Sequence, residues 1–389
     1  MSQYILINRI RVQNANAVAG FTWGFPSITH FLGFTHNLSR KLAKSSFSNT
    51  KLAGCGVISH QNDVHTYGQW NDRFLQNKTP PYLRSHDKTS PPPVIEEAKM
   101  NMTVSLLIHF DGFLGNQTDC FTEWLGKQCL LQRLAGGTIL DIESIQVFDL
   151  SDKNKFYLLK SKLLPGFALM DRSSLLEQHY ESLVTDDLEA ELLDAWLDFV
   201  ALKQRARPKS NLITKHLEAQ QKRGEMELQI LQNWEAHLES IPYEGCIPQS
   251  ILVYFQSLEQ NKTNKAVLEQ WQQYCQPTDK TPADWEYLPK PSSGYLVPIM
   301  AGYKAISEVY ENKEIANTRD NETPVCFVEG VHSIGEWLGV NRFKNKEDIA
   351  GCIWQYDYKK NWYLCRQPVS TELDDNDENT ILTEILELS

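Results

Sequence analysis

The first 150 residues alternate between short stretches with strand periodicity and longer stretches with helical periodicity. Residues 4–13 are rich in β-branched side chains, and Arg9, Ile10, Arg11 and Val12 alternate polar with apolar, which predicts a strand with one basic face. The pattern then predicts a helix over 28–44 capped by Ser27, strands over 53–60 and 102–110, a helix over 119–131 and a strand over 133–148. This order of strand, helix, strand, strand, helix, strand is that of a ferredoxin-like domain, so the predicted fold class is α+β.

From Thr185 the texture of the chain becomes helical, and Asp186 and Asp187 are placed where a first helical turn favours negative charge. Helical spacing relates Leu188, Leu192, Trp196, Phe199 and Leu202, and further helical patterns cover 212–237 and 250–274. Strand character returns at 295–300, and aromatic residues alternate with polar ones over 352–366, as in a hairpin. We therefore predict a core over 1–180, a large α-helical insertion over 181–287, a return to the core over 288–370 and a mobile acidic tail over 371–389.

Composition restricts the class of protein. The chain has 389 residues, of which 41% are hydrophobic and 22% charged, enough for a sizeable core. It contains no apolar run of membrane-spanning length and no secretory signal, so we expect a soluble, cytoplasmic protein. Its eight cysteines are scattered singly, which predicts free thiols rather than a zinc site or a disulfide framework.

The net charge of −11 at first argues against a nucleic-acid partner. The charges are strongly segregated, however: residues 1–62 contain six basic residues and no acid, and the last nineteen residues contain seven acids and no base. Removing that tail changes the balance from −11 to −4, so the sign of the whole chain says little about any one face.

Several sequence features could carry chemistry, although the common catalytic motifs are absent. The chain lacks a Walker loop, a Gly-x-Ser-x-Gly elbow, a His-Glu-x-x-His pair and a Gly-x-Gly-x-x-Gly turn. His30 and His36 lie six positions apart on one predicted helix, about 120° apart around its axis, so they are not expected to act together. A single histidine can still act as an acid or base in RNA cleavage, but packing is the simpler role.

The segment before the first helix combines the three kinds of group that bind single-stranded RNA, namely cations, amides and aromatic rings. These groups are Arg9, Arg11, Asn14, Asn16, Thr22, Trp23 and Phe25. Trp23 and Phe25 are equally well interpreted as ordinary core aromatics. A second candidate is the turn from Arg133 to Gly137, because consecutive glycines let backbone amides approach a phosphate, although any tight turn uses them too.

Several collinear blocks resemble one known family. They are Ile10-Arg-Val-Gln-Asn-Ala-Asn-Ala17, Thr22-Trp-Gly-Phe-Pro-Ser27, Arg133-Leu-Ala-Gly-Gly137, Leu163-Leu-Pro-Gly-Phe-Ala-Leu169, Gly294-Tyr-Leu-Val-Pro-Ile-Met-Ala-Gly-Tyr303, Asn317-Thr-Arg-Asp-Asn-Glu-Thr-Pro324 and Gly335-Glu-Trp-Leu338. In order and spacing they resemble the small-subunit family of the type I-F CRISPR surveillance complex, the Csy complex. Much of 205–285 is expected to be an addition to the family's chain, and the chain beyond about 340 to lie outside the resemblance.

The resemblance implies a non-catalytic RNA-binding protein of the Cas-five RAMP class, built on an RRM-like ferredoxin core and acting in antiviral defence without a cofactor or metal. Such a subunit holds the 5′ handle of the CRISPR RNA together with the large subunit, beside the terminal backbone subunit, and meets target DNA only through the complex. The expected RNA or subunit contacts are Arg11, Asn14, Asn16, Trp23 and Phe25, with Arg40, Arg133, Gly136, Gly137 and Arg319 as secondary candidates.

Two other functions stay open. One is a metal-independent endoribonuclease that processes CRISPR repeat RNA, in which His30 or His36 with a nearby tyrosine or lysine supplies acid and base. The other is a protein wedge between partners that themselves hold the RNA.

Overall fold

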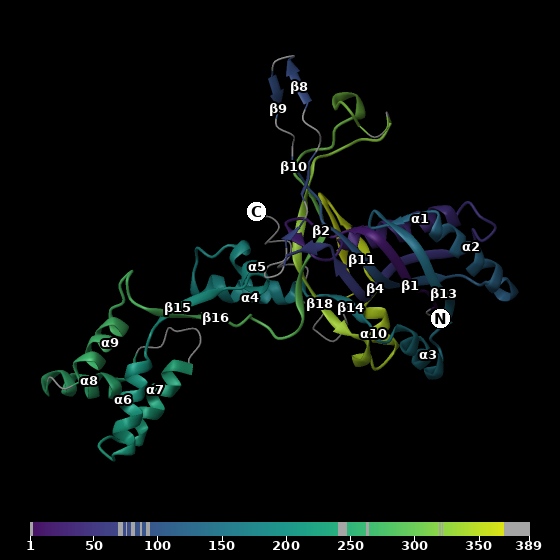
Figure 1. Ribbon diagram of the computed structural model, residues 1–389. Helices are drawn as coiled ribbons and strands as arrows, with labels where there is room; N and C mark the ends of the chain where they lie inside the picture. The colour runs from purple at the N-terminus through teal and green to yellow at the C-terminus, as the bar shows by residue number, and fades with distance from the viewer. Residues whose placement is uncertain are drawn as a thin grey trace. The chain divides into compact units, whose positions relative to one another are not determined.

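The computed structural model describes residues 3–68, 73–74, 76–78, 82–85, 88–90, 94–239, 247–261, 264–318, 320 and 322–368 (Figure 1). Cα packing divides the chain into two compact units. The first contains residues 1–196 and 293–389, and the second contains residues 197–292. The predicted tail over 371–389 lies outside the described residues, and the four-part division of the chain stays a prediction.

The first unit is built on a ten-stranded sheet in which all paired neighbours run antiparallel. In spatial order the strands are β12 (Arg133–Leu134), β13 (Gly137–Asp149), β1 (Gln3–Asn16), β11 (Lys99–Asp111), β4 (Lys51–Val64), β14 (Phe167–Asp171), β18 (Val328–Gly339), β17 (Leu296–Ala305), β20 (Trp362–Arg366) and β19 (Gln355–Lys359). The mixed α+β class is therefore confirmed.

The first half of this sheet follows the predicted order of elements. Along the chain β1 leads to α1 (Ile28–Leu42), β4, β11, α2 (Thr118–Leu130) and β13. In space β1 lies between β13 and β11, and β11 lies between β1 and β4. Helix α1 begins where the sequence indicates, because the Ser27 side chain accepts a hydrogen bond from the backbone N–H of Thr29 at 3.3 Å.

Apolar side chains of β1 lie on both faces of this half-sheet, because consecutive strand residues point to opposite faces. Ile5 and Ile7 join a core with α1 and α2, whereas Tyr4 and Leu6 join a second core on the other face. That second core includes residues of α3 (Lys153–Leu163) and α10 (Lys346–Gly351). Beyond the part covered by α3 and α10, the second face carries polar residues.

The helical pattern after residue 180 differs from the prediction in its boundaries. Helix α4 (Ser173–Asp186) ends where a helix was predicted to begin, α5 (Leu192–Val200) is separate, and Leu188 is 89% exposed. The side chain of Asp187 accepts a hydrogen bond from the backbone N–H of Glu189 at 3.0 Å, a local bond that competes with helix continuation.

The second unit packs four helices around its own core, which includes Trp234, Phe255 and Trp271. The helices are α6 (Asn211–Lys222), α7 (Leu228–Glu239), α8 (Gln249–Asn261) and α9 (Lys265–Cys275). Each of the two long helical patterns is thus broken into two helices. At the first break Gly224 adopts a φ of +72° and the N–H of Glu225 reaches back to the carbonyl of Gln220, which ends a helix as a left-handed glycine does.

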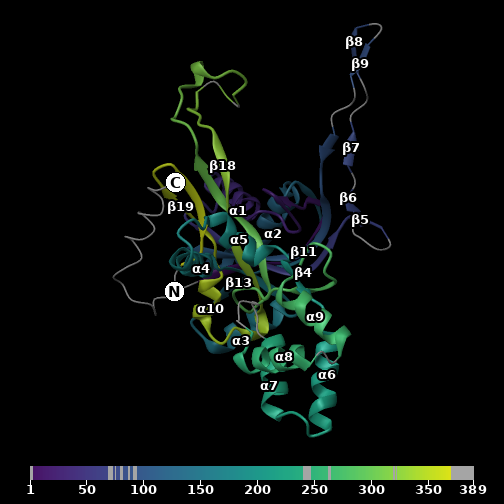
Figure 2. The ribbon, with the colours of Figure 1, turned by 90° about the vertical axis from the view of Figure 1, so that its left-hand side faces the viewer.

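The remaining elements are short. The two-stranded ribbons contain β2 (Val18–Ala19) with β3 (Thr22–Trp23), β5 (Thr66–Tyr67) with β6 (Arg73–Phe74), β7 (Gln76–Lys78) with β10 (Val94–Glu96), β8 (Tyr82–Ser85) with β9 (Lys88–Ser90), and β15 (Gln204–Pro208) with β16 (Ala283–Tyr287). The 3₁₀ turns are η1 (Gly115–Gln117), η2 (Asn312–Glu314) and η3 (Val340–Arg342). In Figures 1 and 2 the connection from β17 to β18 extends beyond the body of the sheet.

Candidate nucleic-acid interface

Arg11 lies on the open part of the second sheet face. It is exposed, whereas its neighbour Val12 is buried in the core with α1. Consecutive strand residues point to opposite faces, so the Arg11 side chain lies on the face away from α1 and α2. Its cross-strand partners are Thr103 on β11 and Asp141 on β13. The guanidinium thus emerges from the middle of the half-sheet, beside one carboxylate.

Amide side chains surround this position. The side chain of Asn101 accepts a hydrogen bond from the backbone N–H of Asn14 at 3.1 Å. Asn14 itself is exposed and has a φ of +56°, at the point where the register between β1 and β11 shifts. Gln61 pairs with Thr103 and Asp63 pairs with Asn101, which puts both β4 residues on this face. The open face therefore offers amides, a guanidinium and carboxylates to a ligand.

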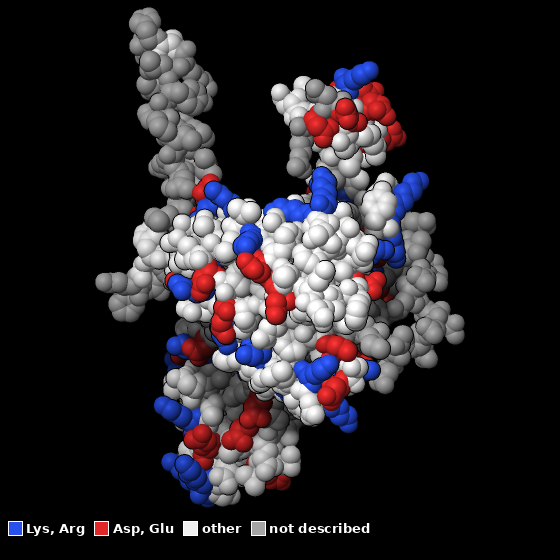
Figure 3. Space-filling model, turned by 90° about the vertical axis from the view of Figure 1, so that its right-hand side faces the viewer, with Lys and Arg blue, Asp and Glu red and all other residues white. Residues whose placement is uncertain are grey.

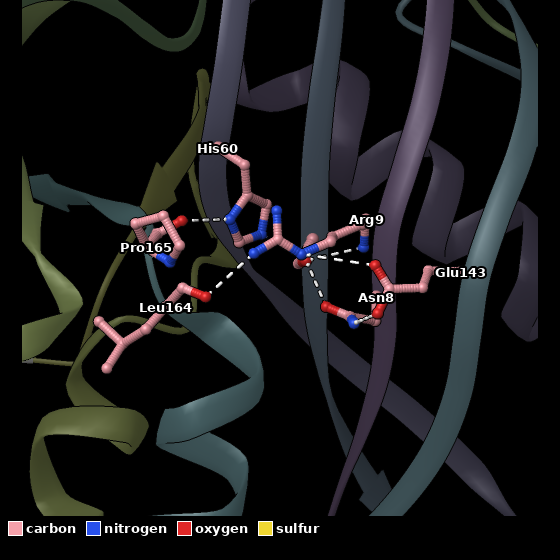
Figure 4. Close-up of polar contacts among 7 residues, drawn as sticks. Asn8, Arg9, His60, Glu143, Leu164 and Pro165 are labelled. Carbon is pink, nitrogen blue, oxygen red and sulfur yellow. Dashed lines mark hydrogen bonds and ion pairs between the residues drawn. The ribbon is translucent and has the colours of Figure 1, made fainter.

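Arg9 sits at a bulge next to this open face. Its φ is +47°, and the register of β1 against β11 shifts between Ile7 and Ile10. The guanidinium donates to the carbonyl oxygen of Leu164 at 3.0 Å and lies 3.5 Å from a carboxylate oxygen of Glu143 (Figure 4). A left-handed arginine is strained, and the contacts of its side chain hold it in that conformation.

His60 connects β4 to the same loop. One ring nitrogen, Nδ1, lies 2.6 Å from the carbonyl oxygen of Pro165 (Figure 4). The other, Nε2, lies 2.7 Å from the hydroxyl of Ser105. Removal from water lowers the pKa of the His60 imidazole, and the hydrogen bond to Pro165 partly opposes this effect. Because a carbonyl oxygen can only accept, Nδ1 is the donor to Pro165, and in the neutral ring Nε2 is then available as an acceptor.

Ser105 is the centre of this polar cluster. Its hydroxyl oxygen accepts the backbone N–H of Arg9 at 2.9 Å and lies 3.1 Å from the side-chain oxygen of Asn8, whose amide donates to Glu143 at 3.2 Å. One hydroxyl proton can serve either His60 or Asn8, so the cluster has two hydrogen-bond arrangements. We call Asn8, Arg9, His60, Ser105 and Glu143 the sheet-face cluster.

Of the sheet-face cluster, only Arg9 is predicted from the sequence. Its members come from four strands. The hydrogen-bonded residues Asn8 and Glu143, for example, are 135 positions apart in the sequence. A signal was present, because Asn8 and Ser105 interrupt strands that are otherwise apolar and both are buried. Buried polar side chains of this kind require partners.

The predicted glycine turn closes against the end of β1. The backbone N–H of Asn16 donates to the carbonyl of Ala135 at 2.8 Å. A Cβ on Gly137 would lie 2.7 Å from the carbonyl oxygen of Gln13, whereas one on Gly136 would meet nothing within 4 Å. Gly137 therefore serves close backbone packing, and Gly136 is the glycine that is open to a ligand. Asn16 is also tied down, because its amide donates to Val18 at 2.9 Å.

Arg40 and Arg133 are exposed on two neighbouring elements, α1 and β12. The side chain of Asn37 donates to Gln132 at 2.5 Å and so joins α1 to the start of β12. Arg40 lies on α1, on the other side of the sheet from Arg11, whereas Arg133 alternates with Leu134, which is buried in the core with α1. The Arg133 side chain therefore points to the same side of the sheet as Arg11. Arg319, the remaining predicted cation, lies outside the described residues. On the face drawn in Figure 3 basic and acidic side chains of the described residues are interspersed.

Trp23 and Phe25 lie partly inside the protein rather than on an open platform. Both are half-buried against the core that includes α1. The Phe25 ring stacks on Phe31 at a centroid distance of 5.5 Å and meets Trp337 edge-on at 4.8 Å. The structure therefore brings Arg11 and Asn14 together and sets Phe25 on the other side of the sheet.

The two histidines considered for catalysis differ in environment. His30 is half-buried with Nδ1 at 3.3 Å from the carbonyl oxygen of Ser27, and burial lowers the pKa of His30. His36 is exposed on α1. Within the part of the chain that the structure describes, no group of three or more His, Cys, Asp or Glu side chains is arranged to hold a metal ion. None of the described helices is long and apolar enough to cross a membrane.

Comparison with known proteins places the chain in a family. A family model described as "CRISPR-associated protein (Cas_Csy2)" matches residues 5–239 and 247–365. The chain is 29% identical over 363 residues to a protein of Pseudomonas aeruginosa (strain UCBPP-PA14) named "CRISPR-associated protein Csy2", with 89% of each chain covered. The match includes most of 205–285 and continues past 340 to 365, so the expectations that 205–285 and 340–365 lie outside the family are wrong. The chain belongs to the Csy2 family of CRISPR-associated proteins.

Proposed function

We propose that this chain is a non-catalytic RNA-binding subunit of a type I-F CRISPR effector complex, the Csy complex. In this role it holds the 5′ handle of the CRISPR RNA together with the large subunit, beside the terminal backbone subunit, in the cytoplasm. It meets target DNA through the assembled complex. Membership of the Csy2 family supports its place among CRISPR proteins, and the resemblance of its sequence blocks to the small-subunit family supports the particular role.

We further propose that β1, α1, β4, β11, α2 and β13 form an RRM-like core. The order of these elements and the spatial order β13, β1, β11, β4 support this assignment, since they reproduce the ferredoxin-like arrangement. RRM domains bind single-stranded RNA on the face of the sheet. The corresponding face here carries Arg11 with amides from Asn14 and Asn101.

The observation that carries the RNA-binding role is the position of Arg11. Its side chain is exposed at the centre of the half-sheet on the face away from α1 and α2, where a phosphate can approach it. Asn14 and Asn101 add donors and acceptors for base edges. Arg40 on α1, and Arg133 with Gly136 at the β12–β13 turn, are further proposed contacts, for RNA or for a neighbouring subunit. Phe25 is assigned to packing, and Trp23 to a contact with a neighbouring subunit.

The test measures RNA binding by Arg11→Gln in the full chain. We expect Arg11→Gln to weaken binding of a single-stranded repeat RNA by about tenfold and to lower the salt dependence by about 0.7 in the logarithmic slope, the value for one phosphate contact. Lys127→Gln is the matched control, because Lys127 is an exposed cation on α2 that pairs with Glu123 at 2.7 Å. Equal binding by Arg11→Gln and Lys127→Gln would contradict the proposed interface.

A second measurement addresses catalysis. We expect the purified chain to leave repeat RNA uncut in the presence of a chelator over hours. Cleavage that disappears in His36→Ala would instead support the endoribonuclease and overturn the non-catalytic role.

A further inference from the structure

A basic hollow lies between α3 and the segment that joins η3 to α10. Its volume is about 680 Å³, and its lining includes Tyr157, Lys160, Arg342 and Lys344. All of these residues belong to the first unit. Sequence patterns do not reveal this region, because its two sides are about 180 positions apart along the chain.

Both sides of the hollow are rich in cations. Helix α3, Lys153–Leu163, contains four lysines and no acid, and residues 340–346 contain Arg342, Lys344 and Lys346 and no acid. The lining itself contains three cations, Lys160, Arg342 and Lys344, and one acid, Asp348, whereas Lys155 and Lys346 pair with Asp149 and Glu347, each at 3.9 Å. Such clustering on neighbouring segments is the electrostatic signature of a polyanion site.

The geometry leaves part of this charge available. Lys160 donates to the carbonyl oxygens of Asn341 at 2.9 Å and Phe343 at 2.6 Å, so one of its three N–H donors remains for a ligand. Arg342 and Lys344 are exposed. The acid at the rim, Asp348, has a carboxylate oxygen that accepts the backbone N–H of Lys344 at 2.5 Å, which directs this oxygen toward the chain.

An aromatic ring lies beside these cations. Tyr157 is 60% exposed, and its ring meets Phe156 edge-on at a centroid distance of 5.3 Å. Phe156 is buried in the core, so its side chain provides a fixed contact for the neighbouring Tyr157 ring. Cations with an exposed aromatic ring are the combination by which proteins hold single strands, through phosphates and through stacking on a base.

One short loop links the elements of the hollow to the sheet-face cluster. Leu164 accepts a hydrogen bond from Arg9, and Gly166 accepts one from the backbone N–H of Val340 at 3.0 Å. Residues 164–166 therefore contact β1 on one side and the start of η3 on the other. A single strand of RNA that crosses the open sheet face can follow this loop into the hollow.

We infer that the basic hollow binds the phosphate backbone of single-stranded RNA, with a base stacked on Tyr157, and extends the RNA path from the sheet face. This inference rests on the proposed function, because it takes the ligand to be the same RNA. Arg342 and Lys344 contact phosphates, and Lys160 both fixes the 341–343 backbone and offers its remaining N–H.

The test compares charge-matched double variants of the full chain in binding to a fluorescently labelled single-stranded repeat RNA. Arg342→Gln with Lys344→Gln is expected to weaken binding by about tenfold at moderate salt and to lower the logarithmic salt slope by about 1.4, for two phosphate contacts. Lys313→Gln with Lys359→Gln removes two exposed cations elsewhere in the first unit and is expected to change binding less than about twofold.

The aromatic contact is tested separately. Tyr157→Ala is expected to weaken binding by about tenfold and Tyr157→Phe by less than about twofold, because phenylalanine keeps the stacking ring. Thermal melting of every variant checks that the fold is retained, and the exposure of these side chains makes retention the expected result.

The outcomes separate this inference from the proposed function. If the unmodified chain does not bind the RNA, the proposed function fails and the inference fails with it. If the unmodified chain binds and the Arg342/Lys344 variant binds equally well with the same salt slope, only the inference fails. If that variant loses binding to single-stranded DNA of the same sequence but keeps RNA binding, the hollow takes DNA and the inference is overturned.

Discussion

The guanidinium of Arg9 donates to the carbonyl oxygen of Leu164 across 155 positions of sequence, at a distance of 3.0 Å. This bond links the bulge in β1 to the loop before β14, and His60 reinforces the link by its contact with the next carbonyl, that of Pro165. The loop in turn meets η3 through Gly166. The position of the basic hollow relative to the sheet face therefore depends on Arg9 and His60.

Two substitutions of Arg9 distinguish the stabilisation that its side-chain contacts provide from the cost of its left-handed backbone conformation. Arg9→Ala removes the bond to Leu164 and the Glu143 contact while keeping a side chain at a φ of +47°, so we expect a loss of about 1 kcal/mol. Arg9→Gly loses the same contacts but relieves the left-handed strain, which favours glycine by about 1 kcal/mol. Thermal unfolding of the two variants should place the glycine variant above the alanine variant, and the reverse order would refute this account.

Stability should fall as the solution becomes acidic. Burial lowers the pKa of His30, His60, His216, His237 and His332 below the ordinary value of 6.5. On lowering the pH, the unfolded chain takes up these protons first, so the stabilisation is complete above about pH 6.5 and is lost as the pH falls through the folded values. The check is a series of melting temperatures between pH 8 and pH 5.5.

His60→Gln tests the share of one residue in this pH dependence. Glutamine keeps hydrogen-bonding capacity but does not titrate, so the variant should show a shallower decline in melting temperature below pH 6.5. Arg9 and Glu143 face His60 and both influence its pKa, in opposite directions. A decline as steep as that of the unmodified chain would show that His60 does not contribute.

The two glycines of the β12–β13 turn should differ in their tolerance of alanine. A Cβ on Gly137 would lie 2.7 Å from both the Gln13 carbonyl oxygen and a methyl carbon of Val12, so Gly137→Ala should cost about 1–3 kcal/mol. Gly136→Ala meets open space and should cost about 1 kcal/mol, since only its φ of +74° opposes a side chain. Urea unfolding of the first unit measures the loss in free energy of unfolding for both variants. A larger loss for Gly136→Ala than for Gly137→Ala would contradict the packing argument.

The sequence predicted elements better than it predicted the site. The strand at β1 and the capped start of α1 could be predicted because alternation and the Ser27 cap are local signals. Gly224 and Asp187 are also local signals, in this case for the end of a helix. The pattern of apolar residues did not indicate these helix ends, because apolar residues continue at helical spacing on both sides of each break.

The sheet-face cluster could not be predicted from spacing alone. It depends on the register of β1 against β11 and β13, and a bulge between Ile7 and Ile10 changes which side chains share a face. Arg11 and Asn14 were identified from their residue types, and the structure adds that they share an open face. The basic hollow needs the contact of α3 with 340–346, which no short-range pattern encodes.

A substitution in the core of the second unit should lower the stability of that unit and leave the stability of the first unit unchanged. Phe255 is fully buried, and its ring stacks on Trp271 at a centroid distance of 4.1 Å, so Phe255→Ala should cost about 3–5 kcal/mol. Because the two units have separate cores, hydrogen exchange should accelerate in peptides from α6 to α9 and stay unchanged in β1 and β11. Val253→Ala on the same helix is the control, since Val253 is 53% exposed and its truncation should cost less than about 0.5 kcal/mol. Equal acceleration of exchange in both units would show that their stabilities are coupled. Acceleration confined to α6–α9 would show that the first unit keeps its sheet independently of the helical unit. The proposed RNA surface would then also be independent of the helical unit.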